Sequence, residues 1–226
     1  LVSAALVLMM TPALALFYAG FVRSRNVLNT MVMSFTAMAL VSVLWVLFGY
    51  SLAFSPGSGA LAPFIGGWQW VGLSNWSAPY GDGQLSHGAV AFFQLTFAII
   101  TPALIIGAIA ERMKFISIMA FVVLWMFAVY FPFAHMVWST TGLMCGPLNP
   151  DAGIKAIDFA GGTVVHVTAG VGALVTKLPE LTDLLGGRHT EALALIHLGN
   201  DIVGVCLRKI SRGVNLETLQ NVLLPV

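Results

Sequence analysis

Apolar residues run in long stretches along this chain, and the charged residues between them fall into a few clusters. Residues 1–22, 26–81 and 115–150 carry no charge at all. A helix that crosses a bilayer needs about 20 mostly apolar residues. The pattern therefore predicts an all-α protein with five transmembrane helices, at residues 1–22, 30–54, 87–110, 115–138 and 158–176.

The stretch between the second and third predicted helices has a different composition. Residues 55–86 are rich in glycine and proline, which favour turns and loops, so we expect a long loop here and not a further span. Trp68, Trp70 and Trp76 lie in this loop. Tryptophan is enriched at membrane–water interfaces, so the loop is expected to lie at one surface of the membrane.

Positive charges predict the orientation of the helices. Arg23 and Arg25 follow the first predicted helix, and Arg112 and Lys114 follow the third, whereas residues 55–86 contain no lysine or arginine. Connections rich in these residues usually face the cytoplasm. We therefore expect the N-terminus outside and the end of the fifth helix inside.

Composition excludes several classes of protein. Of the 226 residues, 58% are hydrophobic and only 8% are charged, with a net charge of +1. Soluble domains have about a quarter charged residues, so this is an integral membrane protein. It has no basic stripe for nucleic acid. Two cysteines, Cys145 and Cys206, make neither a disulfide framework nor a zinc site, and no metal or cofactor is expected.

The last fifty residues differ from the rest. They hold five of the ten lysines and arginines and five of the nine acidic residues, with short apolar stripes at helical spacing. The sequence thus divides into a membrane part, 1–176, and a short helical cytoplasmic tail, 177–226. Because Leu1 already lies within an apolar run, we also expect that a segment upstream is missing.

Enzyme signatures are absent from the sequence. It contains no GxxxxGK[ST], GxGxxG, HExxH or GxSxG motif. Glu111 is expected on the cytoplasmic side, and Asp82, Asp151 and Asp158 on the outer side. No pair that includes Glu111 can therefore share a substrate for acid–base work. The chain is not expected to be an enzyme.

His166 is the most unusual residue of the predicted spans. An ionisable side chain within an apolar helix is costly and commonly faces the protein interior or a pathway. Gly162 and Gly170 share its helix face and would let another helix approach closely, which would bury the imidazole in protein. We favour a functional role over that of a packing histidine.

Aromatic residues form a second candidate site. Phe93 and Phe97 are four residues apart, so their rings lie on one helix face, and Trp138 ends the fourth predicted helix. Aromatic faces attract small cations, although phenylalanine at this spacing is usually core or lipid-facing. Asp158 could shape an outer cation site, or serve as the N-cap of the fifth helix, or do both.

These residues stand in four strings that resemble the ammonium transporter (Amt/Mep/Rh) family, and its ammonium-transporter branch more than its Rhesus-type branch. The resemblance runs from residue 1 to about 175. The strings are ALFYAGFVRSRNVLN (15–29), AFFQLTFAIITPALIIGAIAERMKF (91–115), FPFAHMVW (131–138) and DFAGGTVVHVTAG (158–170).

The resemblance implies a fold and a function. The family has eleven transmembrane helices, built as two inverted five-helix repeats plus a last helix, and assembles as a trimer. This chain would be the first repeat. By motif, Phe93, Trp138 and Asp158 match the outer ammonium recruitment site, Phe97 a gating ring, and His166 the first of two pore histidines. Ammonium would bind outside, lose its proton and cross as ammonia.

The same resemblance implies a setting for the protein. It would be a multi-pass protein of a bacterial or archaeal plasma membrane, in contact with lipid, with a cytoplasmic PII-type signal protein as a partner. The second repeat is absent, and with it the second gating phenylalanine, the recruitment serine and the partner histidine. Residues 177–226 resemble no part of the family, which would continue into a loop and a sixth helix.

Other hypotheses remain open from the sequence alone. The chain could be a membrane sensor or interaction protein that transports nothing and uses its tail to meet a partner, or an inactive truncated product. An intramembrane enzyme using His135 or His166 lacks a nucleophile and a ligand set, and is the weakest of the three.

Overall fold

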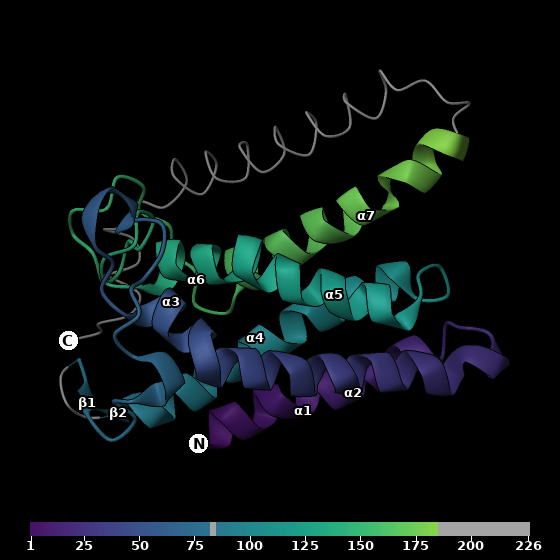
Figure 1. The fold of residues 1–226 in the computed structure, drawn as a ribbon, viewed down its shortest axis with the longest axis horizontal. Coiled ribbons are helices and arrows are strands. Elements are labelled where there is room, and N and C mark those ends of the chain that lie inside the picture. The colour runs from purple at the N-terminus through teal and green to yellow at the C-terminus, as the bar shows by residue number, and fades with distance from the viewer. Residues whose placement is uncertain (82–84, 185–226) are drawn as a thin grey trace, which may run out of the picture.

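Long helices run back and forth along one axis to form the fold (Figure 1). In this computed structural model, residues 1–81 and 85–184 are described. Within them the helices are α1 (Val2–Ala19), α2 (Val27–Leu44), α3 (Tyr50–Phe54), α4 (His87–Ile109), α5 (Phe115–Trp125), α6 (Phe131–Trp138) and α7 (Thr168–Leu184).

The first four predicted spans are confirmed as long apolar helices. Within the described residues, four helices are long and apolar enough to cross a membrane: Val2–Ala19, Ser24–Phe54, His87–Ile109 and Phe115–Trp138. The second starts earlier than expected because a 3-10 turn, Ser24–Asn26, leads directly into α2.

The fifth predicted span is helical, with different ends. It begins at Gly162 instead of Asp158 and continues through α7 to Leu184 instead of ending at 176. It is not among the four apolar spans. Its sequence mixes valine with glycine, threonine and His166, which makes it the most polar of the five. The predicted division at residue 177 falls inside this helix, and most of the predicted tail, 185–226, lies outside the described residues.

Wide turns interrupt three of the helices. Trp45–Gly49, Met126–Tyr130 and Gly162–Val167 are π-helical, a form that mostly appears as single turns within α-helices. The first two turns pack together, because the ring centroids of Phe48 and Phe127 lie 6.1 Å apart. A Cβ atom at Gly49 would lie only 2.6 Å from the ring of Phe131, which follows the second turn. Glycine at position 49 therefore lets the second and fourth spans approach closely.

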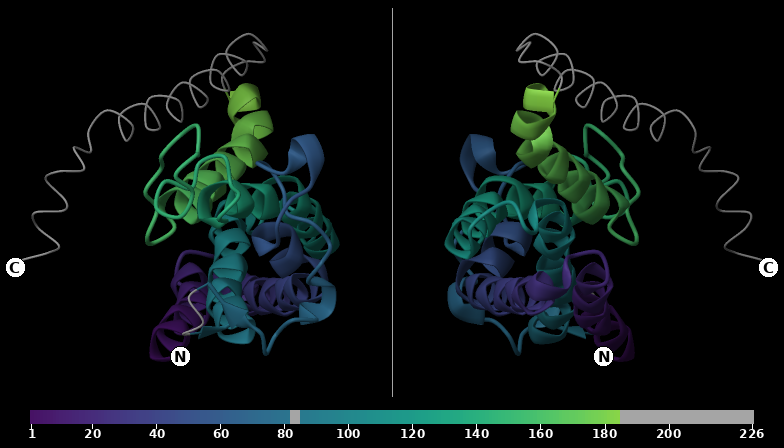
Figure 2. Two further views of the ribbon diagram at one scale, coloured as in Figure 1. Left: turned by 90° about the vertical axis from the view of Figure 1, so that its left-hand side faces the viewer. Right: turned by 90° about the vertical axis from the view of Figure 1, so that its right-hand side faces the viewer.

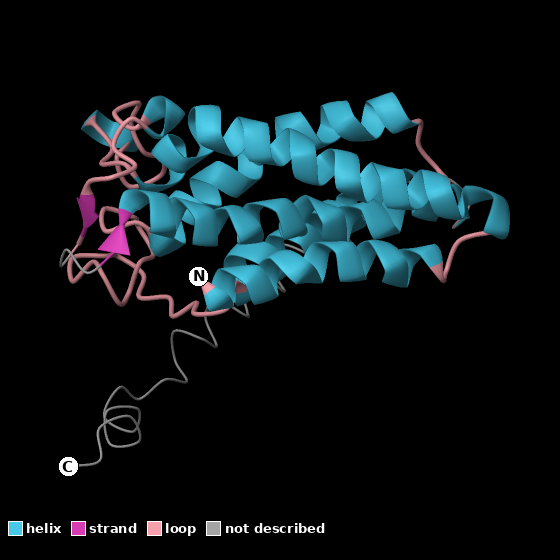
Figure 3. Ribbon diagram, turned by 90° about the horizontal axis from the view of Figure 1, so that it is seen from below, coloured by secondary structure: helices cyan, strands magenta, loops and turns pink. Residues whose placement is uncertain are grey.

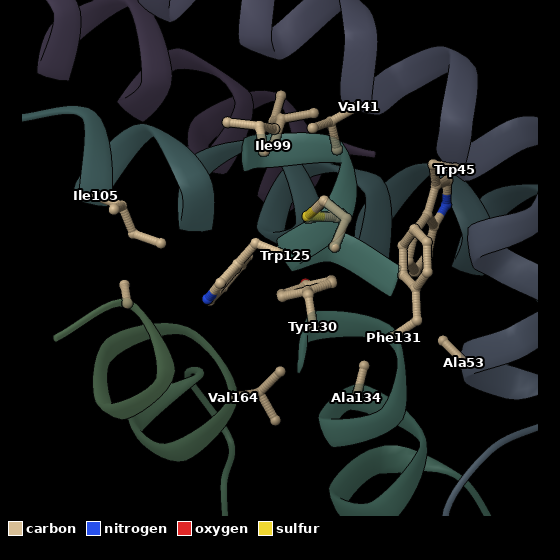
Figure 4. Close-up of a cluster of buried hydrophobic side chains, with 14 of the residues drawn as sticks. Val41, Trp45, Ala53, Ile99, Ile105, Trp125, Tyr130, Phe131, Ala134 and Val164 are labelled. Atoms are coloured by element: carbon tan, nitrogen blue, oxygen red, sulfur yellow. The ribbon is translucent and has the colours of Figure 1, made fainter. Parts of the chain in front are cut away.

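The core lies between these spans, with α4 at its centre. In its most apolar part, α4 is 56% buried, compared with 17% for α1, and it contacts α1, α2, α5 and α7. The end-on views in Figure 2 show α1 and α7 on opposite sides of the bundle. Figure 4 shows Trp45, Tyr130 and Phe131 meeting between these helices, with ring centroids 6.1–6.5 Å apart.

One end of the bundle carries the long connections (Figure 3). The predicted loop 55–86 is confirmed and contains two 3-10 turns and a hairpin of β1 (Pro79–Tyr80) and β2 (Leu85–Ser86). Trp68 and Trp76 are exposed. Trp70 is half-buried: its ring stacks on Tyr50 and lies edge-on to His87.

The opposite end carries the short, positively charged connections. A single acidic side chain joins them: Glu111 Oε1 accepts hydrogen bonds from the Arg23 backbone N–H at 3.0 Å and from the Asn26 amide at 2.7 Å. These two donors hold the pKa of Glu111 below its usual value, with the Asn26 amide as the larger cause. The basic clusters therefore meet at one end, as the charge pattern predicts.

Candidate functional site

Phe93 and Phe97 form the first part of the site, on one face of α4. Their ring centroids are 5.1 Å apart and the rings meet edge to face at 79°. Both are half-buried. Threonine hydroxyls bind the carbonyl oxygens of the same two residues, Thr96 to Phe93 and Thr101 to Phe97, each at 2.6 Å.

Trp138 adds a third ring. It is the last residue of α6, and its ring lies edge to face with Phe97, with centroids 5.8 Å apart. Phe93, Phe97 and Trp138 therefore form a continuous series of rings, which we call the aromatic row. Trp138 is also half-buried, so parts of all three rings are accessible. Such rings attract a cation through their faces and offer it few hydrogen bonds.

Asp158 connects the aromatic row to the helix that follows it. Its backbone carbonyl accepts a hydrogen bond from Trp138 Nε1 at 2.9 Å. Its carboxylate accepts three more, from the backbone N–H groups of Gly162, Thr163 and Val164, at 2.7–3.0 Å. The capping role considered from the sequence is thus confirmed, although Asp158 lies four residues before the helix and not at its first position.

Gly161 allows the chain to turn between Asp158 and the helix. Its φ of +79° is a left-handed conformation that favours glycine. An added Cβ atom would meet the Val165 side chain at 2.6 Å and the Phe97 ring at 3.8 Å. Sequence reasoning missed this residue. The signal available was the pair of glycines that follows Asp158.

His166 lies on the next turn, and its environment differs from the one expected. The imidazole is exposed, and so are Gly162 and Gly170 on the same face. A Cβ atom built on Gly170 would have no neighbour within 4 Å. We call this surface the open face. The expected burial of His166 in protein is therefore not achieved within the described part of the chain, because nothing there packs over these three positions.

A second histidine, His135, was considered only as a remote catalytic candidate. It is fully buried in α6, one turn before Trp138. Both ring nitrogens face backbone carbonyls, those of Ala53 and Ala62. The sequence signal was a polar residue inside the apolar run FPFAHMVW. Its two carbonyl partners could not be read from the sequence because they lie more than seventy residues away.

The fold and the site together define a class of protein. Apolar helices long enough to cross a membrane, joined by loops at one end and by basic connections at the other, make this a multi-pass membrane protein. The model of the Ammonium Transporter Family matches residues 1–181. The chain belongs to this family, as the resemblance predicted, and the family's name describes transport and not catalysis.

Individual relatives agree with this assignment. The chain is 49% identical over 177 residues to the ammonium transporter of Bacillus subtilis, which covers 77% of this chain and 41% of that protein. It is 43% identical over 198 residues to the ammonium transporter of Aquifex aeolicus, covering 85% and 42%. The match to the Aquifex aeolicus protein, over 198 residues, is longer than the match to the family model, which covers residues 1–181.

A solved structure shows the same fold. The crystal structure of Saccharomyces cerevisiae Mep2 superimposes with a TM-score of 0.65 at 34% identity, covering 78% of this chain and 39% of that one. The chain therefore spans about two fifths of the length of the relatives it matches. This partial coverage is consistent with the first of two repeats.

Proposed function

We propose that this chain forms one half of a path that carries ammonium or ammonia across a membrane. The observation that carries the proposal is the connection from the aromatic row through Asp158 to the open face with His166. Three accessible rings lead to one acidic residue, which holds the N-terminal end of the helix that presents the histidine. The alternatives without transport give this continuous arrangement no role.

The outer step uses Phe93, Trp138 and Asp158. Ring faces attract a small cation such as ammonium without replacing all of its hydration, and Trp is the strongest aromatic partner. The Asp158 carboxylate faces backbone N–H groups, so it acts mainly by fixing the geometry of the site and adds negative charge near it.

The inner step uses Phe97 and His166. A bare ion in hydrocarbon is costly, whereas neutral ammonia crosses an apolar constriction at much lower cost. Phe97 is the middle ring of the aromatic row, faces Gly161 and is the proposed gate. Beyond it, the imidazole of His166 can accept or pass on the proton that ammonium leaves behind.

The open face requires a partner. In inverted-repeat transporters the site lies between the two repeats, so we propose that a complementary repeat covers His166 and that the complete protein is a homotrimer.

The basic end, with Arg23 and Arg112, would face the cytoplasm of a bacterial or archaeal cell, with the N-terminus outside. A cytoplasmic PII-type signal protein would bind at that end. We keep the division into a membrane part, 1–176, and a tail, 177–226, as part of the proposal.

Uptake of radiolabelled methylammonium tests the proposal. The chain is expressed in cells that lack ammonium transporters, alone and together with the remaining part of the Bacillus subtilis relative. We expect uptake with the complementary part, and its loss in His166→Ala and in Phe97→Ala. Leu124→Ala is the control, because Leu124 is 70% exposed on α5 and is not part of the aromatic row.

The result also separates the alternatives. Normal membrane insertion of both parts without uptake would contradict transport. Deleting residues 185–226, which follow α7, should leave uptake intact. A sensor that acts through its tail predicts the reverse: loss of function on deletion, and no effect of His166→Ala.

A further inference from the structure

His135 joins three segments at the loop end of the bundle. Its side chain is 0% exposed. Nδ1 lies 3.0 Å from the carbonyl oxygen of Ala53, in the last turn of α3, and Nε2 lies 2.9 Å from the carbonyl oxygen of Ala62, in the long loop. The hydroxyl of Thr141, in the connection after α6, lies 3.3 Å from the same Nε2.

This arrangement needs two ring protons. Carbonyl oxygens only accept hydrogen bonds, and a neutral imidazole has a single N–H to donate. Both carbonyls can be satisfied at once only by the doubly protonated ring. Ala53 lies at the C-terminal end of α3, and Ala62 directly follows a 3-10 turn. Carbonyls at such ends lack helical partners and carry partial negative charge, which favours a cation.

Loss of one proton leaves a defined alternative. With Nε2 unprotonated, its lone pair would face the Ala62 oxygen, which is unfavourable, whereas the Thr141 hydroxyl could turn and donate to it. The charged ring therefore holds the loop at Ala62, and the neutral ring releases that bond and takes Thr141 instead. Burial opposes the charged ring, and the two carbonyls favour it.

We propose that His135 is a proton-dependent clasp that positions Trp138. The charged ring ties α3 and the loop to α6, and Trp138 lies one turn further along α6. The segment that follows α6 packs closely against it, because a Cβ atom at Gly142 would clash with the His135 carbonyl oxygen. Proton uptake by His135 thus fixes the ring that ends the aromatic row.

The titratable groups of the neighbouring elements do not replace this role. Tyr50 of α3 is hydrogen-bonded to His87, and Asp158 is occupied by backbone N–H groups. Tyr130 and His166 lie on the other segments that pack on α6. Within the described residues, none of these groups is hydrogen-bonded to the His135 ring, whose partners are the carbonyls of Ala53 and Ala62 and the hydroxyl of Thr141.

NMR titration tests the clasp directly. The chain carries isotope-labelled histidine and tryptophan in lipid nanodiscs, and the pH is varied from about 5 to about 9, which brackets the usual histidine range. His135→Gln assigns the ring signal among the five histidines. We expect both ring nitrogens to be protonated at the acidic end, and the Trp138 indole N–H signal to move with the same midpoint.

Two variants separate the clasp from a merely structural role. Thr141→Val removes the partner of the neutral ring at an exposed position, so the midpoint should rise to higher pH. His135→Gln should abolish the pH response of Trp138 while the chain remains folded. A ring that takes up no second proton in this range, or a Trp138 signal that titrates unchanged in His135→Gln, would overturn the proposal.

Uptake adds a readout that rests on the proposed function. With the complementary repeat present, the apparent KM for methylammonium should rise about fivefold as the pH increases through the midpoint, as expected for the loss of one hydrogen bond. His135→Gln should show no such step. Absence of uptake in the unmodified chain would contradict the transport proposal alone, because the NMR signals decide the clasp independently.

Discussion

The indole of Trp138 donates a hydrogen bond to the backbone carbonyl of Asp158, and the carboxylate of the same Asp158 accepts three backbone N–H groups of the next helix. One residue therefore fixes both the last ring of the aromatic row and the start of the helix with His166. Removing its side chain should disturb the start of the helix directly and the Trp138 ring only indirectly, because Trp138 is bound to the backbone of Asp158.

Asp158→Ala should lower stability by at least about 1–2 kcal/mol, because a lost N-cap leaves buried donors unsatisfied. Asp158→Asn keeps one acceptor oxygen and should lose less. Thermal unfolding of the chain in detergent measures both. If Asp158→Asn retains most of the stability but loses uptake, the negative charge itself contributes to the cation site. Equal stability of Asp158→Ala and the unmodified chain would show that the capping bonds contribute little.

Trp138→Phe keeps an aromatic ring and removes the donor to Asp158. We expect an apparent KM for methylammonium several times higher, and a larger increase for Trp138→Leu, which also removes the attraction of the ring face for a cation. The comparison uses uptake with the complementary repeat present. A Trp138→Leu protein with an unchanged KM would remove this residue from the recruitment site.

Gly107 is the place where α4 meets α1. A Cβ atom there would clash with the Tyr18 ring, which is held in place by a hydrogen bond from its hydroxyl to the Leu104 carbonyl oxygen. Gly107→Ala should therefore destabilise the chain by about 1–3 kcal/mol, the usual cost of overpacking. Thermal unfolding in detergent tests this, with Tyr18→Leu as a second variant that should partly rescue Gly107→Ala by making room.

The helices could be predicted because bilayer thickness fixes the length of an apolar run. The predicted span 115–138 and the helical stretch Phe115–Trp138 coincide. The wide turns could not be predicted. The need for glycine at position 49 becomes visible only when the Phe131 ring is seen to pack against it. Residues of the tail beyond Leu184 lie outside the described part of the chain.

The residues of the candidate site could be predicted from the sequence better than the contacts between them. Phe93 and Phe97 share a face because four residues make about one turn, and the structure agrees. The sequence predicts that Asp158 starts the fifth helix, but the helix begins at Gly162. The Asp158 carboxylate still binds the first N–H groups of the helix, because it reaches across the turn at Gly161. The exposure of His166 depends on what covers its face, and no local pattern encodes that.

Glu111 gives a pH prediction at the opposite end. Hydrogen bonds from the Asn26 amide and then the Arg23 backbone lower its pKa from the ordinary 4.5. A carboxylate whose pKa is lowered in the folded state adds stability above its unfolded pKa. That stability is lost as the pH falls below about 4.5 and through the lower folded value. Because Glu111 is exposed, the effect should be small. Denaturation at neutral and acidic pH should show it, and Glu111→Gln should lose this part of the pH dependence.

Gly170 tests whether the open face is covered in the complete protein. In the chain alone, an added methyl group meets nothing within 4 Å, and alanine is favoured over glycine inside a helix by up to about 1 kcal/mol. Gly170→Ala should therefore raise the melting temperature of the chain in detergent. In the assembled transporter, the same methyl group would lie where a second helix must approach closely, so uptake with the complementary repeat should fall. A variant that is stabilised alone and transports normally would show that no helix packs against this face at position 170.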